Sequence, residues 1–256
     1  DTKPTNVETN SILVEKDTGK RYWFDGSVWT IDFLPNEISN MEFWYDVSDA
    51  TTVTKDASSY VTQLSDKSTN GRDLTSASTA YPLWVDSVQN NLPVIKFDGI
   101  NDYLSNANVD VNQPSTFFFV YKASVDVVDS ETLFDTVTAS PSTDRIVHQT
   151  DFDVGTYDIF AGAIAVSGNI LDTTNFNQFS MVVNGASSTL SRQGVEIISA
   201  GTNVGSGTLN GITIGSAFSG GQRGAPWLAE FIAYNKLLTA EETALVELYL
   251  NEKWGL

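Results

Sequence analysis

Short apolar runs separated by turn-forming residues constrain the fold of this chain more than any other feature. Each run is rich in β-branched and aromatic residues, and clusters of Gly, Asn, Asp and Ser stand between the runs. The runs cover residues 94–97, 116–121, 157–166, 179–183, 195–198, 212–214 and 228–234. Regular strands with turn signals between them are typical of antiparallel sandwiches and barrels, so we predict an all-β fold.

The C-terminal segment departs from this pattern and predicts an α-helix. Thr239 and Glu242 have the spacing of a capping box, in which the threonine side chain accepts a hydrogen bond from the glutamate amide. Leu245 and Tyr249 then recur at helical spacing toward Trp254. We therefore expect one amphipathic helix at this end of the chain.

The first 35 residues read as a unit of their own. Apolar and aromatic stretches between residues 11 and 30 alternate with turn sequences, which predicts a small β-hairpin or meander. A sheet of this size is only marginally stable alone. Its aromatic residues are therefore expected to pack on each other, on the main domain or on a neighbouring subunit. We predict a hairpin and linker over residues 1–35 and one large β-domain over residues 36–256.

The charge of the chain excludes some classes of partner. Thirty-two acidic residues against fourteen basic ones give a formal net charge of −18. This charge repels phosphate backbones and anionic membrane surfaces, so nucleic acid is not an expected partner. The longest apolar run, residues 117–121, is far shorter than the roughly 20 residues needed to cross a bilayer, and we expect no membrane insertion. The chain has no cysteine, which excludes disulfides and thiol chemistry.

Several motifs in the main domain carry a family likeness. They are FWYDVS at 43–48, LSDKS at 64–68, NGRDL at 70–74, PVIKFDGINDYL at 93–104, LAEFIAYN at 228–235 and the tail at 249–255. In this order they resemble the bacterial and phage branch of the concanavalin A-like, laminin G-like jelly-roll superfamily. The resemblance implies a two-sheet antiparallel jelly-roll sandwich with a C-terminal α-helix and a small N-terminal β-hairpin appendage. It does not fix the function, because this fold hosts lectins, adhesion domains, glycosidases and polysaccharide lyases.

The N-terminal hairpin carries a separate and shorter likeness. Residues 17–30 resemble a hairpin found in phage tail and fibre proteins. Together with the jelly roll, this resemblance implies a surface-exposed virion component in the tail, fibre or capsid. A secreted or cell-surface bacterial protein is the alternative. The expected location is therefore extracellular or on a virion surface.

No catalytic constellation is recognisable in the sequence. Retaining glycosidases need two carboxylates about 5 Å apart, and the Glu-x-Asp-x-Glu motif that supplies them on this fold is absent. Arg145, His148, Gln149 and Tyr157 form the one local group that could imitate a polysaccharide lyase. His148 is the sole histidine and could act as a base. Its spacing does not match lyase strands, however, and a single histidine between strands is more often structural. We predict that the protein is not an enzyme.

Calcium is the most reasonable cofactor, because jelly-roll proteins commonly bind it through oxygen ligands. The best local group is Asp98, Asn101 and Asp102, and Asp151 and Asp153 form a less specific pair. In the alternative interpretation, the first group is a glycine-assisted turn whose side chains bond their own backbone. The alternative is favoured, and calcium is kept as the metal to test.

Sugar binding requires aromatic platforms for the apolar faces of the rings and polar groups for the hydroxyls. Predicted loops supply both kinds of side chain. The candidate ligand-binding residues are Tyr81, Trp84, Arg145, His148, Tyr157, Gln222, Arg223 and Trp227. Gln222 and Arg223 are the better placed, because their glycine-rich loop is not easily buried. For each tryptophan, the alternative to sugar binding is a packing role in the core.

Three functions are consistent with this sequence. The first is a non-catalytic carbohydrate-binding or adhesion module whose partner is a polysaccharide or a cell-surface glycan. The second is a structural virion decoration or assembly protein that docks onto other virion proteins through the N-terminal hairpin. The third is a divergent polysaccharide lyase or glycosidase. Adhesion and assembly both use exposed loops, so the sequence does not separate them.

Overall fold

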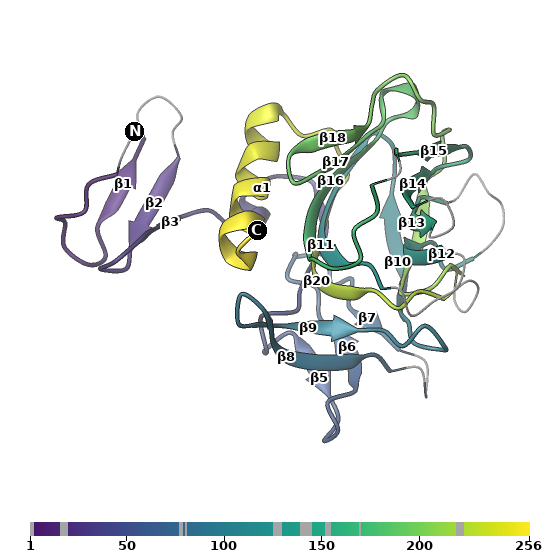
Figure 1. Ribbon diagram of the computed structural model, residues 1–256, viewed down its shortest axis with the longest axis horizontal. Coiled ribbons are helices and arrows are strands. Elements are labelled where there is room, and N and C mark those ends of the chain that lie inside the picture. Colours follow the sequence, from purple (N-terminus) through teal and green to yellow (C-terminus); the bar gives the residue numbers. More distant parts are fainter. Residues whose placement is uncertain are drawn as a thin grey trace.

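The computed structural model is an all-β protein with one α-helix, and it describes residues 3–15, 20–76, 79, 81–124, 130–138, 145–151, 155–168, 170–218 and 223–256. The described strands form two large antiparallel sheets and one small sheet (Figure 1). This arrangement confirms the predicted fold class. None of the described helices is long and apolar enough to cross a membrane.

The three sheets have the following strand orders. The small sheet has the order β1 (Ile12–Val14), β2 (Arg21–Phe24), β3 (Trp29–Ile31). The nine-stranded sheet has the order β15 (Ile164–Val166), β14 (Thr156–Phe160), β13 (Val147–Asp151), β12 (Ser130–Asp135), β19 (Leu209–Ile214), β10 (Leu104–Val111), β7 (Leu74–Thr75), β6 (Val61–Leu64), β5 (Val53–Lys55). The eight-stranded sheet has the order β18 (Val195–Ile198), β17 (Thr189–Arg192), β16 (Asn177–Val183), β11 (Ser115–Lys122), β20 (Trp227–Tyr234), β9 (Leu92–Lys96), β8 (Leu83–Gln89), and β4 (Met41–Asp46) also pairs with β20.

Strand β11 shows why the longest apolar run lies at the centre of a sheet. It pairs with β16 on one side and β20 on the other. Phe117 and Phe119 point into the main core between the two large sheets, whereas Phe118 and Val120 belong to a second core on the opposite face. A strand that is buried on both faces needs a continuous apolar run rather than an alternating one.

Helix α1 (Ala240–Trp254) covers the outer face of the eight-stranded sheet and closes the second core. Its capping box is the predicted one: Thr239 Oγ1 accepts from the Glu242 amide at 3.2 Å, and Glu242 Oε2 accepts from the Thr239 amide at 2.9 Å. Gly255 ends the helix in the left-handed region with φ 65°, where an L side chain is disfavoured.

The N-terminal sheet lies on the far side of α1 from the sandwich (Figure 1). The chain that leaves it contacts the helix: the Ile31 amide donates to Glu252 Oε2 at 2.9 Å, and the Phe33 ring meets the Tyr249 ring edge-on at 6.4 Å. Short 3-10 helices follow at Pro35–Glu37 and, within the body, at Gly185–Ser187. Within the small sheet the Phe24 and Trp29 rings lie 5.0 Å apart, so its aromatic residues pack on one another, whereas Phe33 packs on the main domain.

One predicted strand is divided in the structure. The run at 157–166 forms β14 and β15, which pair as a hairpin. The turn between them contains Gly162 at φ 105°, a backbone conformation that residues with a Cβ atom rarely adopt. The apolar composition continued through the turn, so it did not reveal the break.

Candidate functional site

A pocket of about 490 Å³ brings together residues from three separate segments of the chain. We call it the tyrosine pocket, and its lining includes Tyr60, Tyr81, Lys96, Asp98, Asn101 and Asp102. The β8–β9 hairpin assembles it: Leu83 pairs with Lys96 across the hairpin, and Tyr60 forms a bridge to Leu83. One sugar candidate, Tyr81, and all three metal candidates therefore line the same cavity.

The three metal candidates form a turn that bonds its own backbone. Asp98 Oδ1 accepts from the amides of Ile100, Asn101 and Asp102 at 2.8, 3.0 and 3.2 Å. Asp102 Oδ2 accepts from the Asp98 amide at 3.0 Å, and Gly99 has φ 72°. This is the geometry of the turn interpretation.

The same turn bears on the calcium prediction. Among the described residues, no group of three or more His, Cys, Asp or Glu side chains is arranged to hold a metal. Ca²⁺ takes 6–8 oxygen ligands, whereas Asp98 Oδ1 and Asp102 Oδ2 already accept hydrogen bonds. An ion held by these residues would depend on water for much of its shell. Calcium stays a prediction that binding with and without a chelator tests.

The pKa values of the two carboxyl groups in the pocket are shifted in opposite directions. Desolvation opposes ionisation of Asp98, but three backbone amides outweigh it and lower its pKa. Burial, followed by the negative charge of Asp98, raises the pKa of Asp102 to about 7. Near neutral pH the pocket can therefore present one carboxylate and one partly protonated carboxyl, which can accept and donate hydrogen bonds.

Arg223 lies at the border of the tyrosine pocket. Its Nη1 donates to the Asn101 carbonyl at 3.1 Å, and its guanidinium carbon lies 5.6 Å from the centre of the Tyr103 ring. Gln222 lies outside the described residues. The structure thus brings Arg223, one of the two predicted loop residues, to the site, although it lies 122 positions from Asn101 in the sequence.

The two tryptophan candidates lie outside the lining of this pocket, and both rings contact lysines. Lys55 Nζ is 3.1 Å from the centre of the Trp84 ring. Trp227 is half-buried, with Lys96 Nζ at 4.9 Å and Lys122 Nζ at 4.3 Å from its ring centre. These are cation–π distances.

The remaining candidates lie in or beside the main core. His148 is fully buried, its Nε2 lies 3.0 Å from the Tyr121 hydroxyl, and burial lowers its pKa to about 3. Tyr157 is also buried and stacks on His148 at 6.1 Å. Arg145 instead pairs with buried Asp135, with its Nε donating to Oδ1 at 3.1 Å. His148 and Tyr157 therefore have no exposed surface at which to meet a polymer.

Sequence reasoning missed Tyr60 and Lys96, which both line the tyrosine pocket. Lys96 carried one signal, because it is a polar position between Ile95 and Phe97 in an otherwise apolar strand. An alternating position of this kind points away from the core. Tyr60 carried no such signal, because only the bridge to Leu83 places it here.

No protein-family model and no curated protein matches the chain. Solved structures do resemble it. Trypanosoma rangeli sialidase in complex with 2,3-difluorosialic acid superposes with a TM-score of 0.59 and 12% identity, over 94% of this chain and 44% of that one. The botulinum neurotoxin serotype D binding domain superposes with a TM-score of 0.55 and 12% identity, over 81% of this chain and 50% of that one.

The fold is a two-sheet antiparallel jelly-roll sandwich. The structural likeness shows this much, in agreement with the motifs of the main domain. The chain spans half or less of the length of these similar structures, at 11–12% identity. At that distance the likeness shows the fold alone, and the function must be argued from the site.

Proposed function

We propose that this protein is a non-catalytic carbohydrate-binding or adhesion module and that the tyrosine pocket is its site. The observation that carries the proposal is the lining: two tyrosines, a lysine, an asparagine and two carboxyl groups face one cavity of about 490 Å³. Small-molecule sites commonly have volumes of roughly 300–1,000 Å³. Aromatic rings bind the apolar faces of sugars, and the polar groups bond the hydroxyls. A similar fold occurs in a sialidase in complex with sialic acid.

Binding is favoured over catalysis by the state of the titratable groups. Two carboxyl groups with opposed pKa shifts are a pattern that acid–base enzymes also show. Here both groups are bonded to the backbone of the turn that carries them, and the sole histidine is sealed in the core. We therefore assign Asp98 and Asp102 to sugar hydroxyls. The setting we propose is extracellular or on a virion surface.

Replacing Tyr81 by alanine is expected to weaken glycan binding about tenfold or more, which corresponds to roughly 1.4 kcal/mol per tenfold. The ring supplies contact area that alanine lacks, and Tyr60→Ala should act in the same direction. The measurement is a glycan-array screen with calcium and with chelator, followed by titration of the strongest hit. Reducing-end and unsaturated-product assays on that hit test for turnover.

Trp23→Ala is the matched control, because Trp23 is an exposed aromatic residue of the N-terminal sheet. It should leave glycan affinity unchanged. Unaltered binding by both tyrosine variants would remove the pocket from the proposal. Product formation would replace the binding module by a lyase or glycosidase.

A second candidate function rests on the outer face of the N-terminal sheet. Ile12 pairs with Trp23 across β1 and β2, and their side chains are 63% and 40% exposed. Val14 on the same face is 56% exposed. Adjacent exposed apolar residues of this kind are typical of contact surfaces. We propose docking onto other virion proteins here: removal of the residues before Pro35 should abolish incorporation into particles, and normal incorporation would contradict this role.

A further inference from the structure

A row of side chains crosses four strands on the outer face of the eight-stranded sheet. Leu83 pairs with Lys96, Lys96 with Trp227, and Trp227 with Lys122. Residues directly opposite each other on antiparallel strands project from the same face of the sheet. All four are half-buried. We call this set the lysine–tryptophan row.

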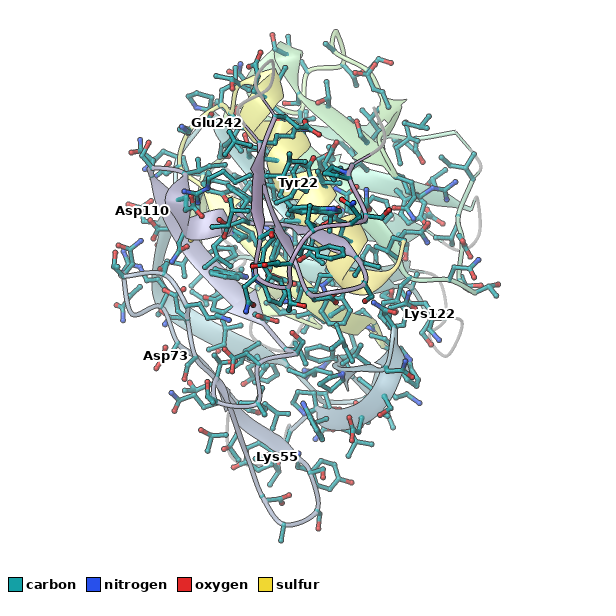
Figure 2. All side chains as sticks on the ribbon, turned by 90° about the vertical axis from the view of Figure 1, so that its left-hand side faces the viewer. Tyr22, Lys55, Asp73, Asp110, Lys122 and Glu242 are labelled. Atoms are coloured by element: carbon teal, nitrogen blue, oxygen red, sulfur yellow. The ribbon has the colours of Figure 1, made fainter. Side chains whose placement is uncertain are left out.

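Both ends of the row open into pockets. Leu83 and Lys96 line the tyrosine pocket. Lys122 lines a second pocket of about 370 Å³, the amide pocket, whose other polar side chains are Gln89, Thr174, Asn175 and Gln193. Gly255 and Leu256 also line it, which places it at the C-terminal end of α1, and Figure 2 shows Lys122 on that side of the molecule.

The length of the row suits an extended ligand. From β8 to β11 it crosses three spaces between neighbouring strands, or about 14 Å at roughly 4.8 Å per space. This is longer than a single sugar ring. A ligand that contacts both pockets would therefore be an oligosaccharide rather than a monosaccharide.

The row carries two positive charges, those of Lys96 and Lys122. Lys96 and Lys122 make no ion pair with any described residue, although the chain has 32 acidic side chains. Their ammonium groups lie at the Trp227 ring instead, and Lys122 is also 5.8 Å from the centre of the Phe176 ring. Cations held by rings rather than by carboxylates keep donors for an anionic ligand.

We infer that the lysine–tryptophan row binds an acidic oligosaccharide. Its carboxylate or sulfate group contacts Lys122, a sugar ring packs on Trp227, and Lys96 donates to hydroxyl groups of the sugar at the tyrosine-pocket end. The inference rests on the proposed function and names its ligand class. It also orients the ligand. Asp98 and Asp102 disfavour an acid in the tyrosine pocket, so a neutral sugar occupies that end and an acidic sugar occupies the Lys122 end.

The test is a glycan array that carries carboxylated, sulfated and neutral oligosaccharides, probed with the intact protein. The strongest signals are expected from acidic glycans of several sugars. Methyl-esterified or desulfated forms of each hit should bind at least about tenfold more weakly, and the form whose affinity falls distinguishes carboxylate from sulfate. Raising the salt should weaken binding of the acidic hits, because exposed charges are screened.

The variants are Lys122→Gln, Lys96→Gln and Trp227→Leu, with Lys3→Gln as the matched control. Lys3 lies over the Tyr22 ring, on the N-terminal sheet, and offers the same loss of charge away from the row. Each variant is first checked by thermal unfolding. The row variants should lose affinity for acidic hits about fivefold or more, and the control should not.

The outcomes separate this inference from the proposed function. Neutral hits that depend on Tyr81 and are unaffected by the lysine variants would overturn the acidic ligand and leave the binding module intact. Acidic hits that bind all three row variants as tightly as the unaltered protein would also overturn the inference. An array without any hit would remove the proposed function and the inference together.

Discussion

Replacing Lys253 by methionine is expected to lower the free energy of unfolding by about 3–5 kcal/mol, the range for breaking a buried ion pair. Lys253 Nζ lies 2.7 Å from Glu230 Oε2 and 2.6 Å from Asp46 Oδ1. Glu230 is fully buried and also accepts from the indoles of Trp44 and Trp254, each at 2.7 Å. Methionine keeps the apolar stem of the side chain, so the loss reports the uncompensated buried charge.

The sign of the pH dependence provides a second measurement. Burial raises the pKa of Glu230, and Lys253 opposes that rise. In Lys253→Met the folded-state pKa should move further above the unfolded value. Such a carboxyl group stabilises the folded state at low pH and loses that contribution as pH rises. The loss in free energy of unfolding of Lys253→Met, relative to the unaltered protein, is therefore expected to be larger at about pH 8 than at about pH 5.

Two further variants complete this test in urea unfolding. Adding Glu230→Gln to Lys253→Met should recover part of the loss, because it removes the unpaired charge. Lys236→Met, which breaks the partly exposed pair with Glu242, should cost less than about 1 kcal/mol. Equal losses for Lys253→Met and Lys236→Met would show that the buried network does not hold α1 on the sheet.

The sequence predicted the parts of the fold whose signals are local. The run at 116–121 became β11, and Thr239 caps α1 as expected. Strands such as β10 and β13 were not named from the sequence, because LSNANVDV and VHQTD carry polar residues at many positions. Their pairing with β19 and β14 makes them strands. Tertiary context commonly overrides β-propensity in this way.

The candidate site was predicted in fragments. Tyr81 entered as a sugar candidate and Asp98 as a metal candidate, and the β8–β9 hairpin joins them in one pocket. Nothing local in the sequence indicates that joining. The lysine–tryptophan row was equally hidden, because Lys96, Lys122 and Trp227 become neighbours only through strand register. The burial of His148, a sugar candidate, was hidden for the same reason, since it depends on distant strands.

The last prediction concerns the centre of the main core, where Phe231→Ala is expected to cost about 3–5 kcal/mol of unfolding free energy. The Phe231 ring lies 4.9 Å from the Phe134 ring, which is on the opposite sheet, and 5.0 Å from the Phe43 ring. Alanine would leave a cavity between the two sheets. Phe231→Leu should cost much less, because most of the volume remains.

Urea unfolding of both variants measures this difference, and Ile100→Ala is the control for loss of an apolar side chain without a cavity. Ile100 is 76% exposed, so its removal should change stability by less than about 0.5 kcal/mol. The sandwich has no disulfide to limit the unfolded state, and packing across this layer must hold the two sheets together. A loss for Phe231→Ala as small as that of Ile100→Ala would mean that the sheets are held elsewhere, with the α1 side and its buried Glu230 as the remaining source of stability.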